Sequence, residues 1–186
     1  CGAVSSMLEM IDFDLGGELF EGWRDLVVAG SPELFERLIV ERSQSGGRHV
    51  VYRCADPVPG NLKLAQRRFV TGSDQEVVIA GKPYRPRLVG DQYEVNCTLI
   101  ETRGERGLFL CAPTPGYEVL QGSLCGLPVL TAEERAALID AARALHEVLP
   151  PVAQVPAGAV ASGRPGDDYN ERGDVRELLT RHGWTC

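Results

Sequence analysis

The sequence predicts an α+β protein with a largely antiparallel sheet and helices packed against it. Short apolar runs bounded by glycine and proline, at 6–14, 48–54 and 93–102, are typical of buried strands. Two other stretches have helical character: 18–29, where apolar residues recur at i, i+3 and i+4, and the segment after Thr131, which opens with a capping box. Strands and helices in this arrangement form an α+β layout.

The chain begins with a predicted strand and a predicted helix. Residues 6–14 form the strand, and the glycine pair Gly16-Gly17 ends it. The helix over 18–29 has one apolar face, made by Leu19, Phe20, Trp23, Leu26 and Val27. Gly30 ends this helix.

A second helix and a hairpin are predicted to follow. Ser31 and Pro32 begin the helix as its N-cap and first helical residue. Residues 39–43 and 48–54 are then predicted to form two strands around the tight turn Ser45-Gly46-Gly47.

The middle of the chain, residues 55–92, is predicted to be rich in hairpins. It contains a strand, turn and strand around Gly81-Lys82. Residues 93–102 and 107–112 are predicted to pair as strands around the next turn.

The C-terminal part divides into a helix, a linker and a short terminal segment. The helix after Thr131 has one apolar stripe, formed by Leu138, Ile139, Ala142, Leu145 and Leu149. Residues 150–163 are uncharged and rich in proline, alanine and glycine, which is typical of a linker. The expected organisation is therefore a domain at 1–149, the linker, and a segment at 164–186 with a last helix at about 174–182.

Composition indicates a globular protein of the cytoplasm. The chain has 186 residues, 44% of them hydrophobic and 24% charged, enough for one domain with a real core. No apolar run approaches the roughly 18–20 residues that span a bilayer, and no signal peptide is visible. The six cysteines form no C-x-x-C pair, which favours reduced structural thiols over a zinc ribbon.

Charge is unevenly distributed along the chain. The net charge is −7, which argues against general affinity for nucleic acid. Residues 48–106, however, carry 10 basic and 7 acidic side chains, and this is the only basic third. A phosphate-rich substrate is expected to lie there, although an ordinary solvated hairpin surface would have the same composition.

Three carboxylates are candidate metal ligands. Asp12 and Asp14 end the first strand and point to the same face, because side chains alternate along a strand. Glu101 ends a second apolar run. Converging acids of this kind suit the two divalent ions of phosphoryl transfer. Glu9 lies three residues before Asp12 and is expected to face the other way, in a structural role.

A turn of small residues beside a histidine is a candidate phosphate site. The backbone of Ser45-Gly46-Gly47 can approach an anion closely, and His49 follows as a donor to a triphosphate oxygen. A serine hydrolase would need a nucleophile elbow such as G-x-S-x-G, which is absent, and no Walker A motif is present.

At these segments the chain resembles the primase–polymerase (prim-pol) domain of the archaeo-eukaryotic primase superfamily, in its phage and prophage branch. The resemblance covers most of residues 5–184 and rests on MLEMIDFD, SQSGGRHVVYRC, GNLKLA, LIETRGERGLFLCAPTPGY, RPGDDYN and a final HGW. It implies an RRM-like catalytic sheet, and primer synthesis and extension from (d)NTPs on a single-stranded DNA template. Relatives carry a longer stretch before the first strand, so the resemblance also implies that part of the catalytic domain precedes Cys1.

The resemblance implies particular roles for residues of this chain. Asp12, Asp14 and Glu101 match the acids that bind Mg²⁺ or Mn²⁺, although many relatives have Asp at the third position. Ser45 and His49 match contacts to the nucleotide phosphates. Arg103 is a further candidate for a phosphate contact, and Lys63 in GNLKLA for a phosphate or template contact. A helicase domain or protein is an expected partner.

Two alternatives to a DNA primase–polymerase remain open. One is a metal-dependent nuclease, because Glu101-x-Arg103 loosely resembles the E-x-K strand of such enzymes. The other is a catalytically degenerate module that binds single-stranded DNA in a replication complex. Aromatic residues make up only 6% of the chain, so a platform for stacking bases is not obvious from composition.

Overall fold

The computed structural model describes residues 1–148, which form a mostly antiparallel sheet with helices packed on it. This confirms the predicted α+β class. The linker expected at 150–163, the segment expected at 164–186 and its helix lie outside the described residues. No helix within 1–148 is long and apolar enough to span a membrane.

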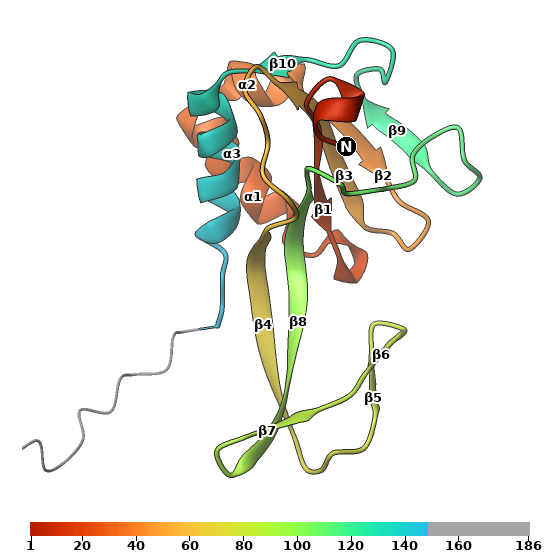
Figure 1. Ribbon diagram of the computed structural model, residues 1–186, viewed down its shortest axis with the longest axis vertical. Coiled ribbons are helices and arrows are strands. Elements are labelled where there is room, and N and C mark those ends of the chain that lie inside the picture. The colour runs from red at the N-terminus through yellow and green to blue at the C-terminus, as the bar shows by residue number, and fades with distance from the viewer. Residues whose placement is uncertain (149–186) are drawn as a thin grey trace, which may run out of the picture. The chain divides into compact units, whose positions relative to one another are not determined.

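The main sheet has eight strands, of which six follow the order β4-β8-β1-β3-β2-β9, each antiparallel to its neighbours (Figure 1). β7 pairs with β8, and β10 pairs in parallel with β3. The strands of this sheet are β1 Leu8–Phe13, β2 Ile39–Arg42, β3 Arg48–Cys54, β4 Lys63–Thr71, β7 Arg87–Val89, β8 Gln92–Arg103, β9 Glu118–Gln121 and β10 Val129–Leu130. A separate two-stranded sheet consists of β5 Val77–Ile79 and β6 Lys82–Tyr84.

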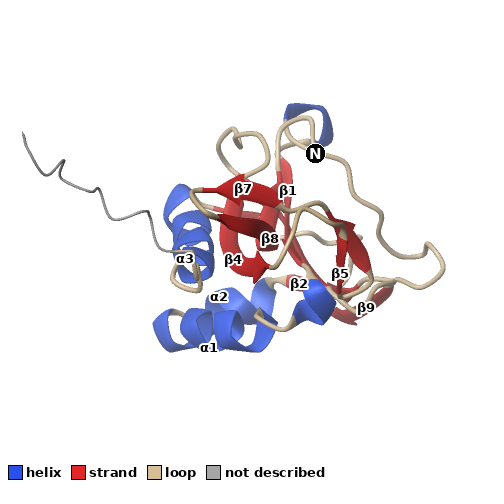
Figure 2. Ribbon diagram, turned by 90° about the horizontal axis from the view of Figure 1, so that it is seen from below, coloured by secondary structure: helices blue, strands red, loops and turns tan. Residues whose placement is uncertain are grey.

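The helices lie along one side of the sheet (Figure 2). They are α1 Phe20–Gly30, α2 Pro32–Arg37 and α3 Ala132–Arg143, with short 3-10 turns at Ala3–Ser5 and Leu15–Gly17. α1 and α2 connect β1 to β2, and β3 lies between these two strands. The order β8-β1-β3-β2 with helices on one face is compatible with an RRM-like fold.

The core between helices and sheet is built around aromatic side chains. Trp23 of α1 is fully buried, and its ring centroid lies 5.1 Å from that of Phe13 on β1. The Trp23 indole N–H donates to the Leu138 carbonyl oxygen of α3 at 3.0 Å, which satisfies its polar atom. Burying side chains of this size contributes roughly 1.5–3 kcal/mol each, so the helix face provides most of the stability.

Helix ends agree with the predicted signals. Gly30 is the last residue of α1, and Pro32 occupies the first position of α2, after Ser31. At α3 the Thr131 hydroxyl accepts from the Glu134 N–H, and the Glu134 carboxylate accepts from the Thr131 N–H. The predicted capping box is therefore confirmed.

Glu9 faces the helices, as alternation along β1 predicted. It is fully buried, and Arg135 of α3 donates to it through two nitrogens, at 2.6 and 2.8 Å. The Tyr52 hydroxyl donates to the same carboxylate at 2.9 Å. A buried charge with three donors is a stabilised structural group, and it is separate from the opposite face of β1.

One predicted strand is wrong and three observed strands were not predicted. Residues 107–112 form a loop in which Leu108 and Leu110 are 85% and 58% exposed, while Phe109 packs against the sheet. The loop pairs with no strand within residues 1–148. Its apolar run therefore corresponds to the packing of Phe109 and not to backbone hydrogen bonds with a neighbouring strand. β4, β9 and β10 were missed, because β4 is polar and largely exposed and the other two are short.

β4 and β8 extend beyond the other strands as a two-stranded arm (Figure 1). β8 pairs with β1 only over Ile100–Arg103, so its earlier residues contact β4 and β7 instead. The hairpin of β5 and β6 lies near this arm (Figure 1), and its turn is Ala80-Gly81, one residue before the predicted Gly81-Lys82. The arm contains much of the basic third of the sequence.

Candidate functional site

Five polar residues lie in one row across the sheet. The register places Asp12 of β1 opposite Glu101 of β8 on one side and opposite His49 of β3 on the other. His49 is in turn opposite Glu41 of β2, and Glu101 is opposite Lys63 of β4. Residues directly opposite in adjacent strands share a face, so this row runs across the face away from the helices.

The three predicted metal-binding acids come together in this row. Asp12 is on β1, Asp14 follows the end of β1, and Glu101 is on β8. Each offers a carboxylate oxygen, and these oxygens all lie within 4.8 Å of one another. The side chains are only 15–19% exposed. A cluster of carboxylate oxygens at this spacing fits a hard divalent cation such as Mg²⁺ or Mn²⁺.

Two cations lie against the acidic cluster. The Lys82 ammonium, on β6, is 2.5 Å from an oxygen of Asp14. The Arg103 guanidinium, on β8, is 2.5 Å from a Glu101 oxygen and 3.8 Å from an Asp12 oxygen. These contacts offset part of the repulsion between the acids, and they place two cationic side chains at the rim of the site.

The environment raises the pKa of Asp12 above its usual value. Burial contributes most, and the neighbouring charge of Asp14 adds to it, whereas His49 and Arg103 act in the opposite direction. Keeping Asp12 ionised among other acids therefore costs free energy in the folded protein. A bound divalent cation would offset this cost, because its charge stabilises the ionised form of clustered acids.

Glu41 orients His49. The His49 Nδ1 is 3.0 Å from an oxygen of Glu41, which is fully buried, and the other Glu41 oxygen accepts from the Ala112 N–H at 2.6 Å. Since a carboxylate only accepts, Nδ1 is the donor and Nε2 is the nitrogen that faces Asp12, 3.6 Å from its nearer oxygen. The ring also packs against Phe109 and Tyr117.

Two candidate site residues, Glu41 and Lys82, were not predicted from the sequence. A signal for Glu41 was present in the predicted hairpin. A turn centred on Ser45 places residue 41 opposite residue 49, which is the observed register. A carboxylate at that position is the ordinary partner of an oriented histidine.

The Ser45 turn packs against the chain that leaves β1. Gly46 has a φ of 85°, a conformation that glycine adopts without strain. A side chain at Gly47 would come within 2.5 Å of the Phe13 carbonyl oxygen, so only glycine allows this close approach. Arg48 holds the turn by donating to the Gly46 and Gly47 carbonyls at 2.8 and 3.1 Å. Ser45 itself is exposed, and its hydroxyl is 3.3 Å from that of Ser43.

The predicted site residues are thus brought together to different degrees. Asp12, Asp14, Glu101, His49 and Arg103 form one contiguous group of side chains. The Ser45 turn adjoins the segment after Asp14, where Gly46 lies against Gly16. Lys63 is exposed, lies opposite Glu101 in register, and extends toward the β4–β8 arm.

Comparisons with protein-family models, with curated proteins and with solved structures found no significant match to this chain. The class that fold and site together define is an α+β protein with a candidate divalent-metal site on the sheet face away from its helices.

Proposed function

We propose that this protein is a DNA primase–polymerase, a template-directed nucleotidyltransferase that uses Mg²⁺ or Mn²⁺. The observation that carries the proposal is the acidic cluster of Asp12, Asp14 and Glu101, whose oxygens lie within 4.8 Å of one another. Its position on the helix-free face of a sheet of RRM-like order agrees with the motif resemblance. Transfer between nucleotides is the reaction for which converging acids, a phosphate-binding turn and flanking cations are all needed.

In this proposal the three acids hold the ions. Asp12, Asp14 and Glu101 would hold the divalent ions through their carboxylate oxygens. Ions bound there would activate the primer 3′-hydroxyl and stabilise the leaving pyrophosphate. The substrates are a primer, a single-stranded DNA template and (d)NTPs, and a helicase is the proposed partner in replication of a phage or mobile element.

The remaining side chains bind and orient the incoming triphosphate. Lys82 and Arg103 already lie against the acids, so they are placed to contact triphosphate oxygens. The Ser45 turn offers its exposed serine hydroxyl, beside the chain that leaves β1. His49 directs Nε2 into the site, because Glu41 accepts from its Nδ1–H, and as the imidazolium it would donate from Nε2 to a triphosphate oxygen. Each group acts by position, without a covalent intermediate.

The test is incorporation of labelled dNTPs on a primed template. The double variant Asp12→Ala/Asp14→Ala should lose activity by about 10³-fold or more, since metal ions supply several kcal/mol of transition-state stabilisation. The matched control Asp56→Ala/Asp74→Ala removes two exposed aspartates outside the cluster and should retain activity. Incorporation by the Asp12→Ala/Asp14→Ala variant at the rate of this control would refute the proposal.

A metal-dependent nuclease is the second candidate. Glu101 forms an ion pair with Arg103 and lies opposite Lys63, so an acid and cations lie together as they do in the E-x-K strand of such nucleases. Incubating single- and double-stranded DNA with Mn²⁺ and no nucleotides separates the two. Degradation that depends on Asp12 would favour the nuclease. A non-catalytic DNA-binding module would bind DNA but neither metal nor nucleotide in a calorimetric titration.

A further inference from the structure

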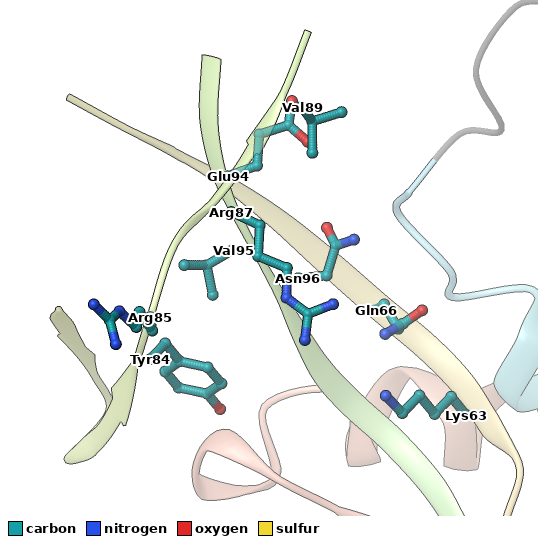
Figure 3. Close-up of a pocket in the computed structure, with 9 residues that line it drawn as sticks. All are labelled: Lys63, Gln66, Tyr84, Arg85, Arg87, Val89, Glu94, Val95 and Asn96. Atoms are coloured by element: carbon teal, nitrogen blue, oxygen red, sulfur yellow. The ribbon is translucent and has the colours of Figure 1, made fainter. Parts of the chain in front are cut away.

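A second pocket lies on the β4–β8 arm, beside the acidic cluster but separate from it. Its volume is about 330 Å³, within the usual range for ligand sites. Most of its polar lining comes from β4, from β8 and from the chain between β6 and β7 (Figure 3). The lining residues that matter here are Lys63, Tyr84, Arg85, Arg87, Glu94 and Asn96.

The pocket carries excess positive charge. Lys63, Arg85 and Arg87 form no ion pair within residues 1–148. The one acid of the lining, Glu94, is already paired with Arg68 at 3.3 Å. Three cations without a protein partner, converging on one cavity, indicate an anionic ligand.

One end of the pocket adjoins the acidic cluster. Lys63 lines it and is also opposite Glu101 in the sheet register. Tyr84 lines it too, two residues after Lys82, which is bonded to Asp14. Figure 3 shows the Arg87 guanidinium directed into the space between Tyr84 and Gln66. A ligand in the pocket would therefore end close to the proposed metal site.

The length of the lining favours a strand over a compact anion. Two lining cations lie beside positions of β8 that are seven residues apart: Arg87 is opposite Glu94, and Lys63 is opposite Glu101. Seven residues of strand span about 23 Å, which is the distance along the arm between these two positions. Each nucleotide of a stacked strand advances about 3.4 Å along the strand axis, so the arm can accompany several nucleotides, more than the length of one triphosphate.

Tyr84 adds an aromatic ring to these cations. Its phenol is neutral at physiological pH, as in an ordinary tyrosine, and burial raises its pKa further, to about 12, so it does not repel a phosphate. Cations along a backbone together with an aromatic face for a base are the usual components of a single-strand site.

We propose that this pocket binds the phosphate backbone of a single DNA strand and guides it to the acidic cluster. The proposal rests on the function proposed above, because it takes the strand to be the primer or template of that reaction. Arg85, Arg87 and Lys63 contact phosphates, and Tyr84 stacks on a base.

The test is binding of a labelled oligothymidylate to the 186-residue chain, measured by fluorescence anisotropy in EDTA without nucleotides. The variant Arg85→Gln/Arg87→Gln should bind about 25-fold more weakly at 0.1 M salt, with the slope of log K against log salt reduced by about 1.4, since each phosphate contact to a single strand contributes about 0.7. The matched control Arg37→Gln/Arg143→Gln removes two exposed arginines from the helix side and should bind as the wild type does. Circular dichroism checks that both variants fold.

Three results would overturn the proposal. The first is equal DNA affinity of the pocket and control variants, and the second is no DNA binding by the wild type. The third is weaker dTTP binding by the pocket variant with unchanged DNA affinity, which would make the pocket a triphosphate site.

Failure of the proposed function would look different. Asp12→Asn/Asp14→Asn should abolish incorporation while keeping DNA affinity in EDTA. If the wild-type chain incorporates no nucleotide but its DNA affinity depends on Arg85 and Arg87, the strand site is supported and the polymerase assignment fails.

Discussion

Replacing Asp12 with Asn tests the metal site directly. The change removes one charge from a cluster whose carboxylate oxygens lie within 4.8 Å, a distance at which two unit charges repel by about 1 kcal/mol in water and about 3.5 kcal/mol at an effective dielectric constant of 20. Lys82 and Arg103 offset part of this repulsion. Since the pKa of Asp12 is raised, its ionised form destabilises the fold at neutral pH. Without metal, Asp12→Asn should therefore be at least as stable as the wild type.

With bound metal, the wild type should become more stable than Asp12→Asn. A cation at about 100 times its dissociation constant stabilises the fold by about 2.7 kcal/mol. A chain of this size gains about 2–4 °C per kcal/mol, so the wild-type melting temperature should rise by about 5–11 °C in Mn²⁺ relative to EDTA. Asp12→Asn should show little of this rise.

Differential scanning fluorimetry in EDTA, Mg²⁺ and Mn²⁺ measures both effects. The matched control is Asp74→Asn, an exposed aspartate in the loop before β5, which should shift as the wild type does. An equal Mn²⁺ shift for Asp12→Asn and Asp74→Asn would refute the assignment of Asp12 as a ligand. The absence of any wild-type shift at millimolar Mn²⁺ would refute the site as a whole.

Three further predictions follow from the buried groups. Glu41→Gln should lower nucleotide incorporation by about 10–100-fold and leave the Mn²⁺ shift intact, because it disturbs the orientation of His49 and not the ligands; unchanged incorporation would contradict this role. Arg135→Met should destabilise the fold by about 3 kcal/mol in urea unfolding, since it removes both guanidinium hydrogen bonds to the buried Glu9 carboxylate and leaves it the Tyr52 hydroxyl, whereas exposed Arg143→Met should cost under about 1 kcal/mol. Burial, followed by the Glu9 charge, raises the pKa of the Cys54 thiol to about 12, so its contribution to stability is complete below about pH 9 and is lost toward pH 12. Iodoacetamide at pH 8 should modify exposed Cys125 and spare Cys54, as mass spectrometry would show; equal labelling would contradict the burial of Cys54.

The elements that were predicted correctly have strong local signals. β1 and β3 are buried apolar strands, and α1 and α3 combine an apolar face with a glycine or a capping box at one end. β4 has no such signal, because much of the strand is exposed and no hydrophobic alternation is required. The 107–112 run misled for the opposite reason: it is apolar, but only Phe109 packs against the sheet.

The acids of the candidate site were identified because local spacing along one strand places Asp12 and Asp14 together. Glu41 and Lys82 were not identified, because no motif within their own segments distinguishes them from other charged residues. Glu41 becomes the partner of His49 through the hairpin register, and Lys82 reaches Asp14 across 68 residues of chain. Such contacts depend on which strands become neighbours.

The sequence alone thus determined the α+β class, the strand that carries the acid pair, the turn of small residues and the helix caps, because each depends on residues a few positions apart. Only the tertiary structure decided that Glu101 and His49 flank Asp12 in one row, that Lys82 and Arg103 cover the acids, and that Lys63, Arg85 and Arg87 share a pocket. The physical reason is that strand order and register come from the burial of a whole sheet face, to which distant segments contribute jointly.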